Sequence, residues 1–416
     1  MGNAGEPKVS SGEAIVLLFG QQPPHFGKEP VDELRSSLSD GTAQKWILDM
    51  VAELPCYWVA LTKKIPEIEN TIPGVKLLTD LDSWLRHGLD VEQESQPNMI
   101  TTPLAVLVQV TQYWRYLEIN ATKNGNRGKR DQTDFQADFL ERQKRNNNKV
   151  EAIGFSTGLL SAFAVASSKN QRELEKNSIV AVRLAMLIGA LVDAQEEWNK
   201  ELDLGKSKSY AVEWPSAKQG EDMRCIVYDL FPEAYIPVLY DETCATVTTS
   251  ERVAPQLLEK LRAADITVEE IGLKGRFHSP DDETKRNTEA LIELCDSLPT
   301  CLQFPDASHL ILPSYSNSAE GEPITPYAGN MHSIAIRAIL TQQCNWYETF
   351  TEIQAAPFGG DIYKHDNRLM VLFGSDLCVP PTLMSRLGLR LAHPTDLGKN
   401  TPHFIKNTLD GEGQLE

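Results

Sequence analysis

The residue pattern with the clearest chemical potential is a serine between two glycines, in the stretch "VEAIGFSTGLLSAF". Gly154, Ser156 and Gly158 form a Gly-x-Ser-x-Gly motif, preceded by an apolar run typical of a buried strand and followed by an apolar run typical of a helix. In this context the motif predicts a nucleophile elbow, a strained turn that presents the serine Oγ while the glycines leave room for neighbouring backbone. The alternative interpretation is a small buried residue beside two glycines that allow close packing.

A nucleophilic serine needs a base, and the chain has eight histidines. His278, in "GRFHSP", follows an expected strand and is the first candidate, although an ordinary surface histidine also fits that context. His309 and His332 are weaker candidates. His25 lies in a Pro-rich loop after the first expected strand.

The same chemistry needs N–H donors for a developing oxyanion. The N–H of Thr157, at the start of the expected helix, is one candidate, and the N–H of Gln21, after the strand "VLLFG", is the second. A general α/β-hydrolase would also carry an acid between serine and histidine and a His-Gly-Gly loop. The chain has no such loop, and the segment between Ser156 and His278 changes character instead.

That change in character predicts the domain organisation. Apolar strands alternate with helices up to about residue 205. From there to 279, short strands rich in β-branched residues flank a helix expected in "SERVAPQLLEKLRAA". The first style then returns, with a strand expected at 309–317. We therefore expect an α/β protein, with a large α/β-hydrolase-like subdomain and an inserted small ferredoxin-like α+β subdomain. The expected ranges are 14–205 and 280–395 for the large subdomain, 206–279 for the small one, and 1–13 and 396–416 for flexible ends of a piece of a longer protein.

Composition restricts the partners. The net charge of −18 argues against nucleic acid. The basic stretch at 123–150, with Lys144 and Arg145, fits either a solvated loop or a docking patch for an acidic partner close to the active site. The apolar run around Arg183 is too short and too charged for a bilayer and predicts a buried helix.

The cysteines and the first residues bear on the compartment. Seven scattered cysteines without a C-x-x-C argue for a reducing compartment and against both a disulfide framework and a zinc site. The first residues lack an apolar leader, so we expect a cytoplasmic protein without a bound metal and without a membrane partner.

Taken together, these motifs resemble the malonyl-transacylase type of acyltransferase, and most closely the starter-unit acyltransferase domain of fungal non-reducing polyketide synthases. The segments that carry the resemblance are "LFGQQ" at 18–22, "GFSTGLLSAFAVASS" at 154–168, "AVRLAMLIGALVD" at 181–193, "GRFHSP" at 275–280, "SYSN" at 314–317 and "VLFGSDLCVPPTL" at 371–383.

The resemblance implies ping-pong transfer of an acyl group without a bound cofactor. The donor is an acyl-coenzyme A or the carrier protein of a partner reducing synthase or fatty acid synthase, and the acceptor is the phosphopantetheine thiol of the synthase's own acyl carrier protein. It implies Ser156 as nucleophile and His278 as base, with Gln21 and Thr157 as oxyanion donors. It also implies a backbone carbonyl that orients the histidine, for which Asn345 in "QQCNWY" is the expected residue.

The sequence departs from the family pattern at two positions. Most starter-unit acyltransferases carry cysteine where this chain has Ser156, and both a natural serine and a replacement of cysteine fit the sequence. Malonyl-type relatives carry an arginine that pairs the free carboxylate, and Ile188 aligns with that arginine. An isoleucine cannot pair a carboxylate, so we expect an acyl pocket at Ile188 for an uncharged acetyl, fatty or reduced polyketide group rather than malonyl.

Two other functions remain open at this point. One is a serine hydrolase or thioesterase, which would transfer the acyl group to water. The other is a nucleophile-substituted docking module that binds acyl groups without transferring them.

Overall fold

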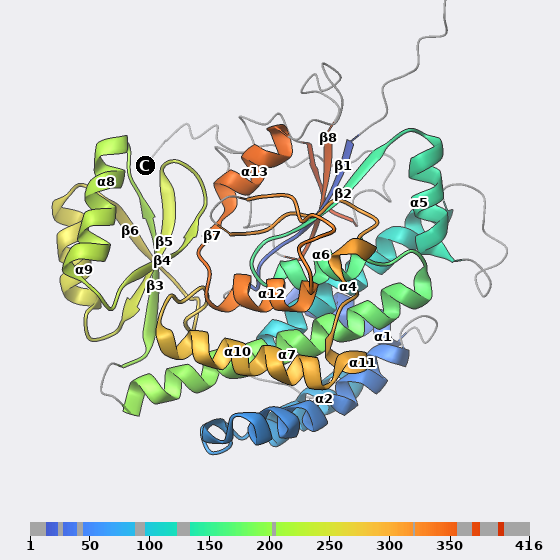
Figure 1. Ribbon diagram of the computed structural model, residues 1–416, viewed down its shortest axis with the longest axis horizontal. Helices are drawn as coiled ribbons and strands as arrows, with labels where there is room; N and C mark the ends of the chain where they lie inside the picture. The colour runs from blue at the N-terminus through green and yellow to red at the C-terminus, as the bar shows by residue number, and fades with distance from the viewer. Residues whose placement is uncertain are drawn as a thin grey trace, which may run out of the picture.

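The computed structural model describes residues 14–23, 28–39, 45–87, 96–122, 134–201, 205–318, 321–355, 368–374 and 390–394, which form a mixed α/β fold with two sheets (Figure 1). The strands are β1 Ala14–Phe19, β2 Lys149–Gly154, β3 Ser207–Glu213, β4 Tyr235–Leu239, β5 Cys244–Ser250, β6 Thr267–Ile271, β7 Cys344–Asn345, β8 Arg368–Phe373 and β9 Arg390–Ala392. The α-helices are α1 Lys28–Ser39, α2 Lys45–Lys64, α3 Gly74–His87, α4 Asn98–Thr122, α5 Phe135–Arg145, α6 Gly158–Ala166, α7 Gln171–Glu201, α8 Ala217–Cys225, α9 Ala254–Ala263, α10 Asp282–Ser297, α11 Pro299–Leu302, α12 Met331–Leu340 and α13 Trp346–Ala355. Short 3-10 helices lie at Pro66–Ile68 and Ala307–His309, and a π-helix lies at Ile226–Leu230.

The first sheet is parallel and has the order β2-β1-β8-β9. The run "AIVLLF" of β1 is almost completely buried, as expected for a parallel strand covered on both faces. In the register of this sheet, Phe19 lies opposite both Gly154 and Phe373. The loops that follow β1 and β2 therefore leave the sheet side by side, and this brings Gln21 and Ser156 to the same edge.

A long apolar helix lies beside this sheet. Helix α7 packs along α4 and against α6. Residues Gln171–Lys200 have the length and hydropathy of a membrane span, yet 89% of the most apolar window is buried inside the protein. A core helix has this property, and the sequence prediction of a buried helix around Arg183 is confirmed.

The second sheet has the order β6-β3-β5-β4-β7. Its first four strands are antiparallel and come from the succession β3-α8-β4-β5-α9-β6, while β7 arrives from the later part of the chain and pairs parallel to β4. One face packs on α8 and α9 through Val212, Val247 and Leu257. In Figure 1 these helices cover the outer side of the sheet, and its other face is turned toward the parallel sheet.

The expected α/β class is confirmed, and the expected subdomain boundaries remain predictions. The strand expected at 309–317 is wrong: this segment makes one isolated bridge, between Tyr315 and Pro323. Pro313 has no N–H to donate, although its carbonyl still accepts from the N–H of Ala152 at 3.0 Å. The ends at 1–13 and 396–416 lie outside the described residues.

Candidate active site

Ser156 occupies a turn that only its two flanking glycines permit. Its φ is +52°, the left-handed region that costs a residue with a Cβ about 1–2 kcal/mol. A Cβ on Gly154 would lie 2.3 Å from the backbone N of Leu159, and a Cβ on Gly158 would lie 2.2 Å from the carbonyl O of Phe19. The turn between β2 and α6 thus has the geometry that the sequence motif predicts.

An asparagine far away in the sequence holds this turn. The Oδ1 atom of Asn317 accepts from the N–H of Ser156 at 2.8 Å, and its Nδ2 donates to the carbonyl of Gly154 at 2.7 Å. Asn317 is 1% exposed. One buried side chain therefore satisfies two backbone groups that the sharp turn takes out of regular pairing.

Ser156 and His278 are in direct contact. The Oγ atom of Ser156 lies 2.8 Å from Nε2 of His278, and Nδ1 of the same ring lies 2.7 Å from the carbonyl of Ala338 and 2.8 Å from that of Gln342. Carbonyl oxygens only accept hydrogen bonds, so the ring proton resides on Nδ1 and Nε2 accepts from the serine. Burial lowers the pKa of His278 to about 4, which keeps the ring neutral at neutral pH.

Sequence reasoning placed the orienting carbonyl at Asn345, and the structure corrects this. Helix α12 ends at Leu340, and the turn after it brings the carbonyl of Gln342 back to the ring. Asn345 lies further along: its N–H bonds the carbonyl of Asn317 at 2.9 Å, and its Oδ1 caps α13 at Glu348.

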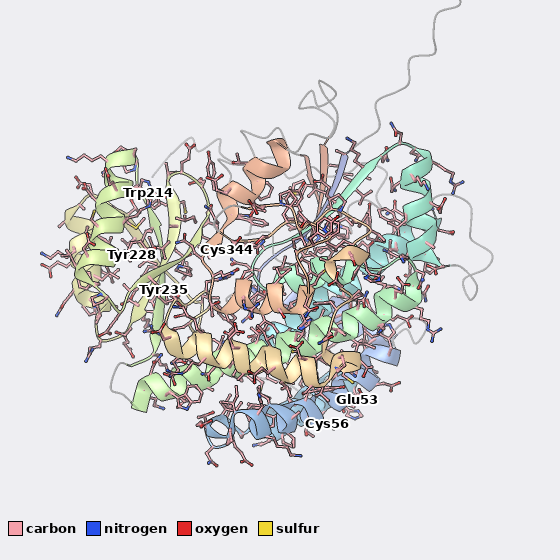
Figure 2. The ribbon with its side chains drawn as sticks, in the orientation of Figure 1. Glu53, Cys56, Trp214, Tyr228, Tyr235 and Cys344 are labelled. Carbon is pink, nitrogen blue, oxygen red and sulfur yellow. The ribbon has the colours of Figure 1, made fainter. Side chains whose placement is uncertain are left out.

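The backbone around His278 is fixed from both sides. The N–H of His278 bonds the carbonyl of Ile339 at 2.9 Å, and the N–H of Ser279 bonds that of Leu340 at 2.7 Å. The hydroxyl of Tyr235, labelled on β4 in Figure 2, donates to the carbonyl of Phe277 at 2.9 Å. The C-terminal end of α12 and the second sheet therefore share the positioning of the histidine.

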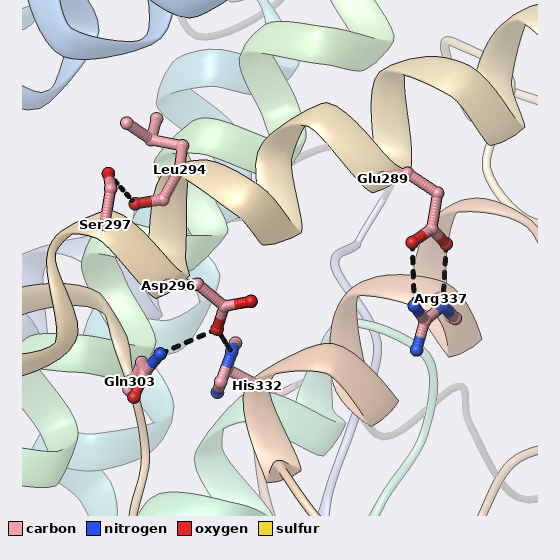
Figure 3. Close-up of polar contacts among 7 residues, drawn as sticks. All are labelled: Glu289, Leu294, Asp296, Ser297, Gln303, His332 and Arg337. Carbon is pink, nitrogen blue, oxygen red and sulfur yellow. Dashed lines mark hydrogen bonds and ion pairs between the residues drawn. The ribbon is translucent and has the colours of Figure 1, made fainter.

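Helix α12 is itself tied to α10 by two polar contacts (Figure 3). Arg337 forms a two-pronged ion pair with Glu289, with both distances at 2.8 Å. The Nε2 atom of His332 lies 3.2 Å from Asp296. His332 thus belongs to the α10–α12 contact and not to the serine site.

The other sequence-predicted histidines also lie elsewhere. His309 lies in an exposed position of a 3-10 helix, with Nδ1 3.4 Å from the Oγ of Ser308. His25 lies outside the described residues. Of the four candidate bases, the structure brings His278 to Ser156.

Both expected oxyanion donors face a cleft beside the serine. Gln21 and Thr157 line this cleft together with Ser156 and His278. Among the described residues, the N–H groups of Gln21 and Thr157 have no hydrogen-bond partner. Two unpaired N–H groups next to a serine hydroxyl form the arrangement that a tetrahedral oxyanion needs.

The cleft is small and partly open to solvent. The second sheet and the segment after β6 supply its apolar wall through Pro237, Val238, Tyr240, Ile271, Leu273 and Phe277. Thr246 and Thr248 add hydroxyls, and none of the lining residues carries a permanent charge. Ile188 is completely buried in the core on α7 and is not part of the lining.

The described part of the basic stretch, residues 134–150, does not line this cleft. Lys144 and Arg145 are exposed on the last turn of α5, which Figure 1 shows on the opposite side of the parallel sheet from the second sheet. The expectation that this stretch lies close to the active site is therefore wrong for α5; residues 123–133 lie outside the described part. No group of three or more His, Cys, Asp or Glu within the described ranges could hold a metal ion.

Several site residues were missed from the sequence. Asn317 stands in the quoted "SYSN" segment, and a buried asparagine next to an expected strand was the available signal. Ala338 and Gln342 act through backbone carbonyls, which leave no mark in a sequence. Gln22 follows Gln21 directly, and its amide is buried.

Comparison with known proteins agrees with this geometry. Residues 30–225 match the family model described as "Starter unit:ACP transacylase in aflatoxin biosynthesis". A non-reducing polyketide synthase of Aspergillus terreus is 46% identical over 401 residues, which is 95% of this chain and 14% of that protein. The iterative polyketide synthase afoE of Emericella nidulans is 44% identical over 394 residues, which is 93% of this chain and 14% of that protein. The chain thus spans about one seventh of the length of these relatives.

Solved structures share the fold at low sequence identity. The acyltransferase domain from the second module of the salinomycin polyketide synthase superposes with a TM-score of 0.52 at 14% identity, covering 92% of this chain and 69% of that chain. MCAT from Mycobacterium tuberculosis gives a TM-score of 0.52 at 16% identity, covering 92% and 98%. With an acyltransferase fold and close relatives among these synthases, the chain belongs to the starter-unit acyltransferase family of fungal non-reducing polyketide synthases.

Proposed function

We propose that this chain transfers an uncharged starter acyl group from an acyl thioester to the phosphopantetheine thiol of an acyl carrier protein, through an acyl-enzyme on Ser156. The observation that carries the proposal is the contact of 2.8 Å between Oγ of Ser156 and Nε2 of a neutral His278. A hydroxyl is a weak nucleophile unless a base takes its proton, and this contact supplies the base.

The first half-reaction loads the enzyme. Oγ of Ser156 attacks the thioester carbonyl carbon while Nε2 of His278 takes the hydroxyl proton. The negative oxygen of the tetrahedral intermediate accepts from the N–H groups of Gln21 and Thr157. The C–S bond then breaks, and His278 returns its proton to the leaving thiolate.

The second half-reaction runs the same steps in reverse with a different thiol. The carrier thiol gives its proton to His278, and its sulfur attacks the serine ester. The C–Oγ bond breaks, and the proton returns to Ser156. The carbonyls of Ala338 and Gln342 stabilise the positive imidazolium in both halves, since they face the Nδ1 proton.

The preference for an uncharged group has structural support in the cleft lining. A malonyl carboxylate in this cleft would meet no lysine or arginine among the lining residues. Burying an unpaired carboxylate is costly, whereas each buried methylene of a fatty chain contributes about 0.8 kcal/mol.

The carrier protein is the proposed acceptor. A malonyl-transacylase that shares this fold, with a TM-score of 0.50, was solved in complex with its type II PKS acyl-carrier protein. We extend the proposal to an acyl-coenzyme A or a partner synthase's carrier protein as donor, and to a cytoplasmic location. We also interpret the parallel sheet as a hydrolase-like large subdomain and the βαββαβ succession as a ferredoxin-like small subdomain.

Intact-protein mass spectrometry tests the proposal directly. Purified protein is incubated with acetyl-, hexanoyl- or malonyl-coenzyme A, alongside Ser156→Ala and His278→Ala. We expect an acetyl or hexanoyl adduct that is absent in Ser156→Ala, and no malonyl adduct. Holo carrier protein should then remove the adduct as acyl-carrier. Release to water in preference to the thiol would indicate a thioesterase, and no adduct from these donors or from a hexanoyl-carrier protein would contradict the proposal.

A further inference from the structure

A buried glutamine joins the loop after β1 to helix α4. Gln22 is 7% exposed, and both its amide nitrogen and its amide oxygen are hydrogen-bonded. Its Nε2 donates to Oδ1 of Asn98 at 3.0 Å and to Oγ1 of Thr101 at 2.6 Å, and its Oε1 accepts from Oγ1 of Thr102 at 2.5 Å. Both amide protons are therefore committed to α4 rather than to a substrate, although Gln22 lines the cleft.

A buried carboxylate fixes the orientation of the next amide. Asp193 on α7 accepts from the backbone N–H and from Nδ2 of Asn98 at 3.0 and 2.9 Å, and from the N–H of Met99 at 2.8 Å. Because Nδ2 of Asn98 must face the carboxylate, Oδ1 of Asn98 must face Gln22. Burial raises the pKa of Asp193 to about 7, against the effect of these three N–H donors.

Close packing of α4 on α7 leaves the hydrogen-bonded series Gln22–Asn98–Asp193 little freedom to shift. A Cβ on Gly189 of α7 would lie 2.2 Å from the carbonyl O of Asn98. The first turn of α4 is thus pressed against α7 where Asp193 caps it. Gln22 is therefore held in place by helices of the protein core and not by a surface loop.

The other end of the connection reaches the oxyanion site. The backbone N–H of Gln22 donates to Oγ1 of Thr157 at 2.9 Å. This bond joins the turn that carries the Gln21 N–H to the turn that carries the Thr157 N–H. The separation of the two N–H groups therefore depends on where Gln22 is held.

We propose that Asp193, Asn98 and Gln22 are positioning residues for this reaction, forming one hydrogen-bonded relay that sets the separation of the Gln21 and Thr157 N–H groups. The inference rests on the proposed function, because it concerns the oxyanion of that reaction. The relay residues touch no reacting atom and act through the two N–H groups.

The expected effect on the loading rate follows from how much one oxyanion donor contributes to the rate. Removing one donor outright costs about 10²- to 10³-fold in rate. Misplacing a donor removes part of its hydrogen bond, so we expect a broken relay to slow acyl loading about 10- to 100-fold. The half-saturating concentration of donor should stay the same, because the ground-state carbonyl does not yet need the site.

Asn98→Asp is the sharpest single change. It keeps the shape of the side chain, removes the Nδ2 donor and sets a second carboxylate against Asp193. The matched control is Asn177→Asp, at the other end of α7. Asn177 is also a buried asparagine, and its Nδ2 donates to the Oγ atoms of Ser167 and Ser168 at 3.0 Å each. The exchanged pair Asn98→Asp/Asp193→Asn restores an amide facing a carboxylate and should recover much of the loading rate.

A second readout separates positioning from general disturbance. In a Ser156→Cys background, alkylation by iodoacetamide at position 156 needs the histidine but forms no oxyanion. We expect Asn98→Asp to slow hexanoyl loading at least about 10-fold while alkylation, followed by peptide mass mapping, changes less than about twofold.

Each outcome decides. Slow loading with unchanged alkylation and recovery in the exchanged pair supports the relay. Equal loss of loading and alkylation, or normal loading in Asn98→Asp, overturns it while leaving the proposed function intact. No loading by the wild-type protein overturns the proposed function and the relay with it.

Discussion

Replacing Asn317 by alanine should destabilise the serine turn more than any ordinary buried asparagine would. The change removes the partners of the Ser156 N–H and the Gly154 carbonyl, which the structure pairs at 2.8 and 2.7 Å. Each buried backbone group left without a partner costs about 1–3 kcal/mol. Relaxation of Ser156 from φ +52° returns about 1 kcal/mol of backbone strain. The two groups together cost about 2–6 kcal/mol, so after the released strain the expected loss in the free energy of unfolding is about 1–5 kcal/mol.

Urea unfolding followed by circular dichroism measures this loss, with Asn177→Ala as the control. The hydroxyls of Ser167 and Ser168 that Asn177 bonds also donate to the carbonyls of Phe163 and Ala164, so its removal should cost only about 1 kcal/mol. Acyl loading should fall in Asn317→Ala and stay normal in Asn177→Ala. A loss for Asn317→Ala no larger than that of the control would refute the argument that this side chain holds the elbow.

Two further predictions concern Ser156 and His278 themselves. The Ser156→Gly protein should be about 1 kcal/mol more stable than the Ser156→Ala protein. Both variants lose the hydroxyl, but only alanine keeps a Cβ at φ +52°. Equal midpoints of urea unfolding would contradict the left-handed turn. Histidine NMR should give a pKa of about 4 for His278, because burial disfavours the charged ring. The imidazole should then stay neutral at pH 5–6, where a solvent-exposed histidine is already largely charged. A pKa near the ordinary value would contradict the burial of His278.

The sequence predicted those features of the site that depend on local pattern. The elbow at Ser156 was predictable because its glycines are dictated by contacts within a few residues and by the adjacent strand. His278 was already the first candidate by sequence, ahead of His309 and His332, and the structure places it against Ser156. Gln21 and Thr157 were predicted as separate donor candidates, and the structure explains their proximity by the parallel pairing of β1 and β2, which places the loops after both strands at one edge.

What the sequence did not reveal depends on the backbone path of distant segments. The Nδ1 partner was expected at Asn345, yet the turn after α12 presents Ala338 and Gln342 instead, and any residue type could supply those carbonyls. The segment at 309–317 has strand-like composition, but Pro313 limits its pairing. Asp193 stands at the end of an apolar run, but its role could not be predicted because it depends on where α4 begins.

The choice of a carbonyl rather than a carboxylate behind His278 bears on the kind of reaction the site favours. A buried carboxylate at Nδ1 would stabilise the imidazolium strongly and raise the pKa of the ring, as hydrolases that attack amides require. Carbonyls stabilise it less, and burial dominates, so the ring is a weak base. A thiol gives up its proton far more readily than water does, so a weak base activates the carrier thiol much better than it activates water, while the conjugate acid protonates the departing Ser156 oxygen in either case. An adduct on Ser156 should therefore pass to a carrier thiol faster than to water, and the comparison of these two rates distinguishes the proposed transferase from a thioesterase built on the same elbow.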